Sequence, residues 1–394
     1  MPTPDAMLLG HATSDYRLQF SLFSPRQFAV MDVDEFGDDT AAPPASDIAA
    51  SVTVAEFDGN TALGPLSGSV DGNGWTCPFA IARYPATFAA YYGVTIAGTA
   101  YYSNAPQAAV TLLRGYMQEV HPQRTAGSDL TQFVVATSHR FLQQSQLSYG
   151  IDWYTSASHL APVDLGEAVR HFIFNHTNLT PRSGVTIALP AITLYQLSTS
   201  ASDILSIIKG LAASALPEPW VFFRRDDQFV VTSHPNLAGA AYPFRTPVLD
   251  FSDDMVYGID AGPQERPDLV ASVNLTAQTS YQDQLTSRYP TDGAPTATGS
   301  RLTLSGLRYD DQPSLDALAP LVYAHERRAW RNVTITAGII FKADIGDLVT
   351  VTTTIPQRGI VWTAKKFVIR QIAYTINQDA RTFLTRFTLD EVVV

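Results

Sequence analysis

The C-terminal part of the chain, residues 332–394, constrains the fold most, because apolar and polar residues alternate along it. A period of two residues is typical of antiparallel strands that bury one face. The alternation occupies successive runs at Val349–Ile355, Val368–Ile376 and Phe383–Leu389. Turn-forming residues stand between these runs at Gln357–Gly359 and Asn377–Asp379. We therefore predict a small closed β-barrel, rich in Thr and Val, that serves as a rigid block for assembly.

The composition favours a protein whose surface is covered by neighbouring subunits. Hydrophobic residues make up 45% of the 394 residues and charged residues 16%, whereas about 25% charged residues is typical of globular proteins. The polar surface must therefore consist largely of Thr, Ser, Gln and Asn. A β-rich subunit of an assembly would have such a surface, and so would a secreted β-protein.

The net charge of -11 argues against tight binding of nucleic acid. Proteins that bind phosphates gather Lys and Arg into patches, but the longest basic run here is Arg327-Arg328. Nucleic acid could still pass the protein without being held by it.

The cysteine count and the apolar runs exclude several further classes. A single cysteine, Cys77, excludes an internal disulfide and a multi-cysteine metal site, and we expect it to be a small buried residue. Residues 1–10 lack the basic and apolar regions of a signal peptide. No apolar run reaches the roughly 18 residues that a transmembrane helix needs. These features predict a protein made in the cytoplasm, with no membrane segment.

Residues 1–104 are predicted to form a β-rich, barrel-like domain. Alternating residues predict two strands within Arg17–Val33, joined at Ser24-Pro25, and further strands at Ser51–Phe57 and Trp75–Tyr84. The stretch Asp32–Asp47 is acidic and rich in Pro and Ala, so we expect an exposed loop there.

A mixed α/β insert is predicted for residues 105–200. Its first helix should begin at Pro106, because Val110, Leu113, Met117 and Val120 have helical spacing. Its second helix should be capped by Asp164 and bury one apolar face, formed by Leu165, Val169, Phe172 and Ile173.

Residues 201–267 are predicted to form a helix-plus-hairpin domain. The helix follows Ser202 and should be well buried, since Ile204–Leu211 is almost continuously apolar. Two apolar runs, Trp220–Phe223 and Phe229–Val231, then flank the turn residues Arg225–Asp227, which indicates a β-hairpin.

Residues 268–394 are predicted to form the C-terminal β-barrel domain, which contains one helix. Leu269–Leu275 and Arg301–Leu307 should be strands. The helix is expected over Ser314–Arg331, with Arg327, Arg328 and Arg331 in its last turn, where the helix dipole favours cations. Pro320 should kink or divide this helix. The fold class is therefore α+β and mainly β, with several domains, two of them barrel-like, and helical or α/β inserts.

No string in the sequence matches a known catalytic, cofactor-binding or metal-binding arrangement. His171 and His176 lie five residues apart and would diverge by roughly 140° on a helix, which is wrong for joint metal ligation. His325-Glu326 is expected on the solvated face of a helix. The string Gly64–Gly68 lacks the spacing of a nucleophile elbow, and no Gly-rich phosphate loop occurs. We predict that the protein is not an enzyme, with catalytic, cofactor-binding and metal residues all absent.

Two stretches of the chain resemble the baseplate hub proteins of contractile and long-tailed bacteriophages and related injection machines. In the first, Ala201–Pro235, a short helix leads into a strand, an acidic turn and a second strand. In the second, which begins at Leu315, a helix is followed by Ile345–Val351 and Phe367–Ile372. A strand that starts Gly-Asp-x-Val and is followed by a strand of the second kind marks the final barrel of such tail proteins.

The resemblance implies a structural protein of the virion, at the tail tip or baseplate. Such hubs are homotrimers in which two barrel-like domains per subunit form a pseudo-sixfold ring. The ring adapts a sixfold tail tube to a threefold tip and leaves a channel through which DNA passes without specific binding. Its partners would be a distal tail ring protein, the tail tube, and tip or fibre proteins. We expect the acidic stretches Asp32–Asp39 and Asp250–Asp254 nearest the channel.

Other classes of function remain open on the sequence alone. A distal tail ring protein would share the barrel but form hexamers. A module that binds a host receptor or a carbohydrate would display aromatic residues, for which Tyr91-Tyr92 and Tyr101-Tyr102 are candidates. A polysaccharide hydrolase would need two carboxylates about 5 to 9 Å apart in a cleft. Oligomer mass would separate the hub, the ring and the module.

Overall fold

Structural detail is available for most of the chain. The computed structural model describes residues 15–23, 53–54, 62–63, 66–81, 93–102, 105–106, 110–125, 128–147, 151–154, 163–176, 184–194, 196–199, 202–262, 264, 270–279, 283–291, 300–338, 340–377 and 382–393. The predicted acidic loop Asp32–Asp47, the strand predicted after Ser24-Pro25 and the pair Tyr91-Tyr92 lie outside these residues. The predicted mainly β class is confirmed, because strands predominate in the part of the chain that is described.

The N-terminal strands belong to a long sheet. They are β1 (Asp15–Phe23), β2 (Thr53–Val54), β3 (Ala62–Leu63), β4 (Leu66–Ser69), β5 (Gly74–Ile81), β6 (Gly93–Tyr102), β7 (Ala105–Pro106), β8 (Val110–Thr125) and β9 (Ser128–Ala136). The strand predicted within Trp75–Tyr84 is therefore confirmed as β5, and Tyr101-Tyr102 ends β6.

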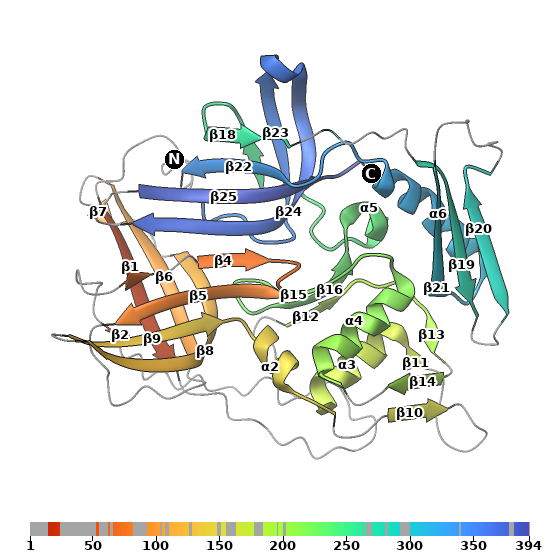
Figure 1. Ribbon diagram of the computed structural model, residues 1–394, viewed down its shortest axis with the longest axis horizontal. Coiled ribbons are helices and arrows are strands. Elements are labelled where there is room, and N and C mark those ends of the chain that lie inside the picture. Colours follow the sequence, from red (N-terminus) through yellow and green to blue (C-terminus); the bar gives the residue numbers. More distant parts are fainter. Residues whose placement is uncertain are drawn as a thin grey trace.

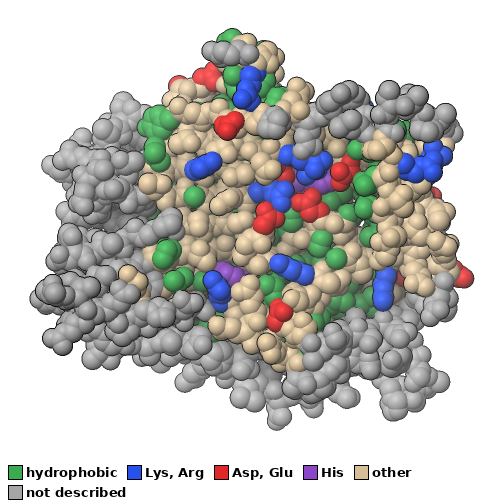
Figure 2. Space-filling view, viewed as in Figure 1, with side chains coloured by type: hydrophobic (Ala, Val, Ile, Leu, Met, Phe, Trp, Pro, Cys, Tyr) green, Lys and Arg blue, Asp and Glu red, His purple; other side chains and the backbone are tan. Residues whose placement is uncertain are grey.

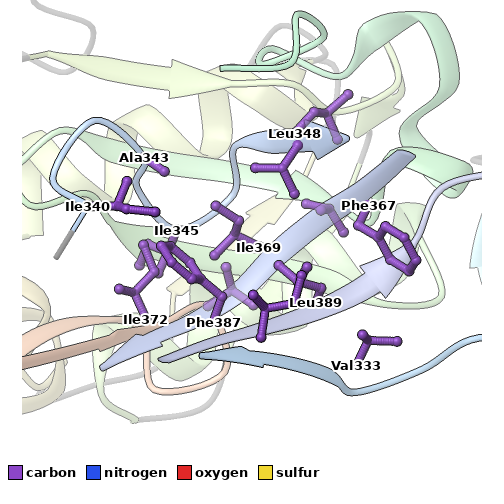
Figure 3. Packing of buried hydrophobic residues seen from close by; sticks show 14 of the residues in the cluster. Val333, Ile340, Ala343, Ile345, Leu348, Phe367, Ile369, Ile372, Phe387 and Leu389 are labelled. Carbon is purple, nitrogen blue, oxygen red and sulfur yellow. The ribbon is translucent and has the colours of Figure 1, made fainter. Parts of the chain in front are cut away.

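The C-terminal strands join the same sheet. They are β17 (Leu249–Phe251), β18 (Val256–Asp260), β22 (Val333–Gly338), β23 (Leu348–Ile355), β24 (Ile360–Asn377) and β25 (Thr382–Glu391). The last three confirm the strands expected from the alternating runs. Their apolar side chains, labelled in part in Figure 3, form a buried cluster that includes Ile369, Phe387 and Leu389.

Pairing between β4 and β24 links the two ends of the chain. Gly68 lies opposite Ile372, and Ser67 lies opposite Ala373. Among the described strands, the main path of the sheet runs β18-β22-β25-β24-β4-β5-β9-β8-β6-β1-β2 (Figure 1). Off this path, β23 pairs with β24, and β17 pairs with β23. This path ends at β18 and β2, so the described strands do not form the closed barrel that the sequence predicted. Backbone hydrogen bonds nevertheless fix the N-terminal and C-terminal β-regions in one orientation.

Strand β8 replaces the helix that helical spacing predicted from Pro106 to Val120, and that prediction was wrong. β8 pairs with β6 on one side and β9 on the other. The register shifts where Leu112 is passed over and again where Gln118 is passed over. Each bulge inserts one residue into the alternation. The bulges therefore produced the spacings of three residues, which together with a spacing of four from the ordinary alternation resemble a helix.

The middle of the chain contains the helices α2 (His139–Gln144), α3 (Leu165–His176) and α4 (Ile204–Ala215). The helices predicted to begin at Asp164 and after Ser202 are α3 and α4; α3 has the predicted cap at Asp164, and α4 is capped by Asp203, which was not predicted. Asp164 Oδ1 accepts a hydrogen bond from Gly166 N (2.8 Å), and Asp203 Oδ1 accepts one from Ser206 N (2.9 Å). The short strands nearby are β10 (Ile151–Tyr154), β11 (Val163–Asp164), β12 (Val185–Ile187), β13 (Thr193–Leu194) and β14 (Gln196–Thr199).

The predicted hairpin is confirmed as β15 (Pro219–Phe223) and β16 (Phe229–Ser233), and it is buried on both faces. Trp220, Phe222 and Val230 pack into the core of the long sheet. Neighbouring residues such as Val221 and Phe229 pack into a second core with α3 and α4. The hairpin thus separates the two hydrophobic cores and contributes side chains to both.

A separate three-stranded sheet, with helix α6 (Gln312–Glu326) against it, lies at the other side of the molecule from β1 and β2 (Figure 1). Its strands are β19 (Val270–Gln278), β20 (Gln284–Tyr289) and β21 (Ser300–Arg308), in the order β20-β19-β21. Leu315, Leu318 and Val322 of α6 pack into the second core.

Helix α6 is shorter than predicted, and Pro320 lies inside it without dividing it. The helix ends at Glu326 and Arg327 caps it, so Arg328 and Arg331 lie beyond its last turn. The reason is a tertiary contact. Glu391 Oε2 accepts hydrogen bonds from Ala329 N (2.7 Å) and Trp330 N (2.9 Å), and these two N–H groups are therefore unavailable to the helix.

Candidate functional site

Ionic groups hold both ends of the hairpin β15–β16. The turn of the hairpin contacts the Ile345-Gly346-Asp347 segment before β23, while its open end contacts α6 and β24. In Figure 2, charged and histidine side chains gather near the middle of the face shown, and much of the surrounding described surface carries neither. We call this arrangement the hairpin clamp. It comprises Arg224, Asp227, Asp344 and Asp347 at the turn end and Glu218, His325, Arg328, Arg370 and Asp390 at the open end.

Asp344 is the centre of the clamp at the turn end. Only 2% of the residue is exposed, and its carboxylate accepts hydrogen bonds from different parts of the fold. The donors are Trp75 Nε1 (2.9 Å), Arg225 N (3.0 Å) and Ile345 N (2.7 Å). One carboxylate therefore ties β5 and the hairpin turn to the segment that leads into β23.

Asp347 completes this end of the clamp. Its Oδ1 accepts a hydrogen bond from Arg224 Nη1 (2.8 Å), and its Oδ2 accepts one from Asp344 N (2.8 Å). Burial raises the pKa of the Asp347 carboxyl, although Arg224 opposes the shift. Burial disfavours the charged form of Arg224, but the two nearby carboxylates outweigh it and raise the pKa of the guanidinium. The guanidinium also lies 4.2 Å from the centre of the Phe244 ring.

Gly346 allows the Asp344–Asp347 segment to approach the hairpin. Its φ is +83°, in the left-handed region that favours glycine. A Cβ atom at this position would lie 2.8 Å from Cζ of Phe222. The carbonyl oxygen of Gly346 also accepts a hydrogen bond from the hydroxyl of the buried Tyr242. The two sequence stretches that carried the resemblance are therefore in direct contact here.

Asp227 anchors the hairpin turn to the segment before α2. It has a φ of +66° and is fully buried. Ser138 donates to it twice, from the backbone N to Oδ1 (2.8 Å) and from Oγ to Oδ2 (2.7 Å). The acidic turn that the sequence indicated thus binds an N–H and a hydroxyl inside the protein.

Glu218 is the central carboxylate at the open end of the hairpin. Its Oε2 lies 2.9 Å from His325 Nε2 and 4.0 Å from Arg328 Nη2, and its Oε1 lies 3.5 Å from Arg370 Nη2. Burial opposes the charged form of Glu218, but the hydrogen bond from His325 and the two guanidinium groups lower its pKa to about 2. A single carboxylate thus connects β15 to α6 and to β24.

Asp390 is the second carboxylate at this end, and it is fully buried. Its Oδ2 lies 2.9 Å from Arg370 Nη1 and 3.7 Å from Arg328 Nη2. Its Oδ1 accepts a hydrogen bond from Asn332 N (2.8 Å). Arg370 also reaches the exposed Asp71, with 2.8 Å between Nη2 and Oδ1. Paired charges therefore join β24 and β25 to the end of α6 and to the turn between β4 and β5.

The geometry of the clamp suits holding elements together better than catalysis. Glu218 and Asp390 are each engaged by guanidinium groups, so neither carboxylate is free to act as a base. Within the described ranges, no group of three or more His, Cys, Asp or Glu side chains is arranged to hold a metal ion. Likewise, no helix in the described part of the chain is long and apolar enough to cross a membrane.

The structure shows the burial and the contacts of several residues that stood out in the sequence. His325 was expected on a solvated face, but it is 3% exposed and contacts Glu218, so that expectation was wrong. Cys77 is buried as expected, and burial raises the pKa of its thiol. Asp253 and Asp254 are exposed, and Thr353 Oγ1 donates a hydrogen bond to Asp253.

Sequence reasoning missed most of the clamp. Glu218, Arg370 and Asp390 are far apart along the chain, and no local pattern connects them. Two local signals were available: the turn residues Arg225–Asp227, and the Gly346-Asp347 pair, which stood out as the start of a strand.

Comparisons with known proteins identify the fold. No protein-family model matches the chain, and no curated protein matches it. Among solved structures, it is similar to the tail protein from Neisseria meningitidis MC58, with a TM-score of 0.55 at 14% identity over 84% of this chain and 92% of that one. It is also similar to the 43 kDa tail protein of prophage MuSo2 from Shewanella oneidensis, with a TM-score of 0.51 at 10% identity over 86% and 95% of the two chains.

A third similar structure is the lidless PdpA-VgrG complex. The TM-score is 0.53 at 7% identity, and the match covers 97% of this chain and 66% of that chain. The resemblance to tail and hub proteins is therefore confirmed at the level of the fold.

Proposed function

We propose that the protein is a structural hub subunit of a phage tail tip and that it forms a homotrimer in the assembled tail. The observation that carries the proposal is the fold, which the chain shares with a tail protein and a prophage tail protein along most of both chains. The clamp supports the proposal, because a hub must transmit load between its parts without changing their relative orientation.

The domain plan of such a hub would divide the chain at the boundaries that the sequence indicated. Residues 1–104 would supply one barrel-like β-region, together with β7, β8 and β9 from residues 105–200. Residues 268–394 would supply the other, together with β17 and β18 from residues 201–267. Pairing of β4 with β24 holds the two β-regions side by side. Three copies of such a pair would give a pseudo-sixfold ring, which adapts a sixfold tail tube to a threefold tip.

The ring would surround a DNA channel and contact neighbouring tail proteins. Those partners are a distal tail ring protein and the tail tube on one side, and tip or fibre proteins on the other. DNA would pass without specific binding, because each Lys or Arg contact to a phosphate adds affinity that slows movement. Within the described part of the chain, we place the stretch Asp250–Asp254 nearest the channel, and its three aspartates, Asp250, Asp253 and Asp254, are exposed. The subunit itself would have no enzymatic activity.

A hub in a related injection machine is the second candidate. The similarity to the PdpA-VgrG structure, which covers nearly all of this chain, favours it. Both candidates assign a structural role to the chain and differ in the particle that contains it. A hexameric ring protein and a carbohydrate-binding module have no such observation in their favour.

Labelling of intact particles tests the proposed location. The chain would carry an affinity tag at its N-terminus, and gold-labelled ligand would be located by electron microscopy on purified tails. We expect label at one end of the tail tube only. An untagged particle controls for adventitious gold. Label along the tube, or on particles that have no tail, would contradict the assignment to a tail tip.

A further inference from the structure

His234 lies where the hairpin meets the open end of the clamp. It follows β16 and precedes the short helix α5 (Pro235–Ala238), and it is fully buried. Its ring packs edge-to-face against Trp220, with centroids 5.4 Å apart, and against His325, with centroids 4.6 Å apart. One ring thus touches the hairpin and α6 at the boundary between the two cores.

A hydrogen bond determines which nitrogen of His234 carries the proton. Asn236 N donates to Nδ1 of His234 at 3.1 Å, so the neutral ring must hold its proton on Nε2. A second proton can only add to Nδ1. Because Nδ1 faces an N–H donor, the protonated ring cannot keep this hydrogen bond. Protonation therefore removes the side-chain cap of α5.

The charges around His234 also oppose its protonation. Burial lowers the pKa of its ring well below the usual value, and His325, Arg328, Arg370 and Arg331 lower it further. These groups come from the last turn of α6, the segment beyond it, and β24. The carboxylates of Glu218, from the hairpin, and Asp390, from β25, are nearby. Arginine side chains already pair with both of them.

Asn236, whose N–H donates to His234, also forms hydrogen bonds with residues at the end of β25 and just beyond it. Asn236 Nδ2 donates to the carbonyl oxygen of Glu391 (3.2 Å), and Val393 N donates to Asn236 Oδ1 (2.9 Å). Asn236 is fully buried, so both hydrogen bonds depend on its fixed position. The cap at His234 is therefore connected through Asn236 to the end of β25.

We propose that His234 is an acid-sensitive latch, whose protonation releases α5 and the end of β25 from the clamp while both hydrophobic cores stay folded. In the closed state the ring resists protonation, whereas in the released state it is free to take up a proton. Closure is therefore strongest above the ordinary histidine pKa and weakens as the pH falls below it.

The size of the effect follows from proton linkage. With an ordinary pKa of about 6.5 in the released state and no protonation in the closed state, acidification from about pH 7 to pH 5 increases the released fraction about 25-fold. The 25-fold increase counts one proton on the His234 ring. Another buried histidine would increase the released fraction further only if its ring became exposed together with that of His234.

Hydrogen exchange of the full-length protein, followed by mass spectrometry at these two pH values and corrected for intrinsic rates, tests the latch. In the wild type, the amides of α5 and of Val393, which is bonded to Asn236, should lose protection about 25-fold at the lower pH. Amides of β19 should keep their protection, because the second core stays folded. In His234→Asn, the side-chain oxygen still caps α5 but cannot be protonated, so protection should not change with pH.

Two further variants make the result decisive. His139→Asn removes another buried histidine, at the turn end of the hairpin, and should leave the wild-type pH response of α5 unchanged. His234→Gln is measured as well, in case His234→Asn does not fold. The proposal is overturned if α5 keeps its protection in the wild type at low pH, if His234→Asn responds as the wild type does, or if β19 loses protection together with α5.

Discussion

The Asp390→Ala variant is expected to lose about 3 kcal/mol of unfolding free energy, because removing one partner of a buried ion pair leaves the other charge unpaired. Asp390 is fully buried and accepts from Arg370 at 2.9 Å and from the backbone of Asn332 at 2.8 Å. Arg328, which is 2% exposed, would also lose its contact with this carboxylate. Urea denaturation followed by tryptophan fluorescence measures the loss.

Asp71→Ala is the matched control for Asp390→Ala. Asp71 contacts the same guanidinium, that of Arg370, at 2.8 Å, but 59% of its side chain is exposed. Exposed ion pairs contribute about 0 to 1 kcal/mol, so Asp71→Ala should change stability by less than Asp390→Ala. Equal losses for the two variants would show that burial of the clamp does not determine its contribution.

Gly346→Ala is expected to destabilise the fold by about 3 kcal/mol, as the sum of two effects. A left-handed backbone costs a non-glycine residue roughly 1 to 2 kcal/mol, and overpacking in a core costs roughly 1 to 3 kcal/mol. The φ of Gly346 is +83°, and an added Cβ would lie 2.8 Å from Phe222 Cζ. The same urea titration measures the change.

Gly359→Ala separates these two effects. Gly359 also has a left-handed backbone, with a φ of +64°, but nothing lies within 4 Å of a Cβ built there. It should therefore lose only the conformational part, about 1 kcal/mol. If both alanine variants lose the same amount, the close approach between Gly346 and the hairpin makes no contribution of its own.

Local pattern predicted many of the strands and helices that the structure contains. The alternation in β23, β24 and β25 and the cap at Asp164 are local signals, and the structure contains each of them. Local pattern failed at β8, because bulges at Leu112 and Gln118 change the phase of the alternation. It also misplaced the end of α6, where Glu391 binds N–H groups that would otherwise extend the helix.

The clamp could not be predicted from the sequence for a related reason. Its charged residues come from segments that are far apart along the chain and that meet where the hairpin separates the two cores. Glu218, just before β15, and Asp390, in β25, are far apart along the chain, yet both contact Arg370. Contacts between distant segments produce no repeating pattern in the sequence, so they cannot be predicted from local periodicity.

The measurement that tests the hub assignment most directly is the number of copies of this chain at the tail tip. A cryo-electron microscopy reconstruction of the intact particle, refined without imposed symmetry, would count them. We predict three copies around the channel, with the two β-regions of each subunit in pseudo-sixfold positions. A ring of six copies would contradict the trimeric hub and indicate a distal tail ring protein, and a single peripheral copy would indicate a binding module.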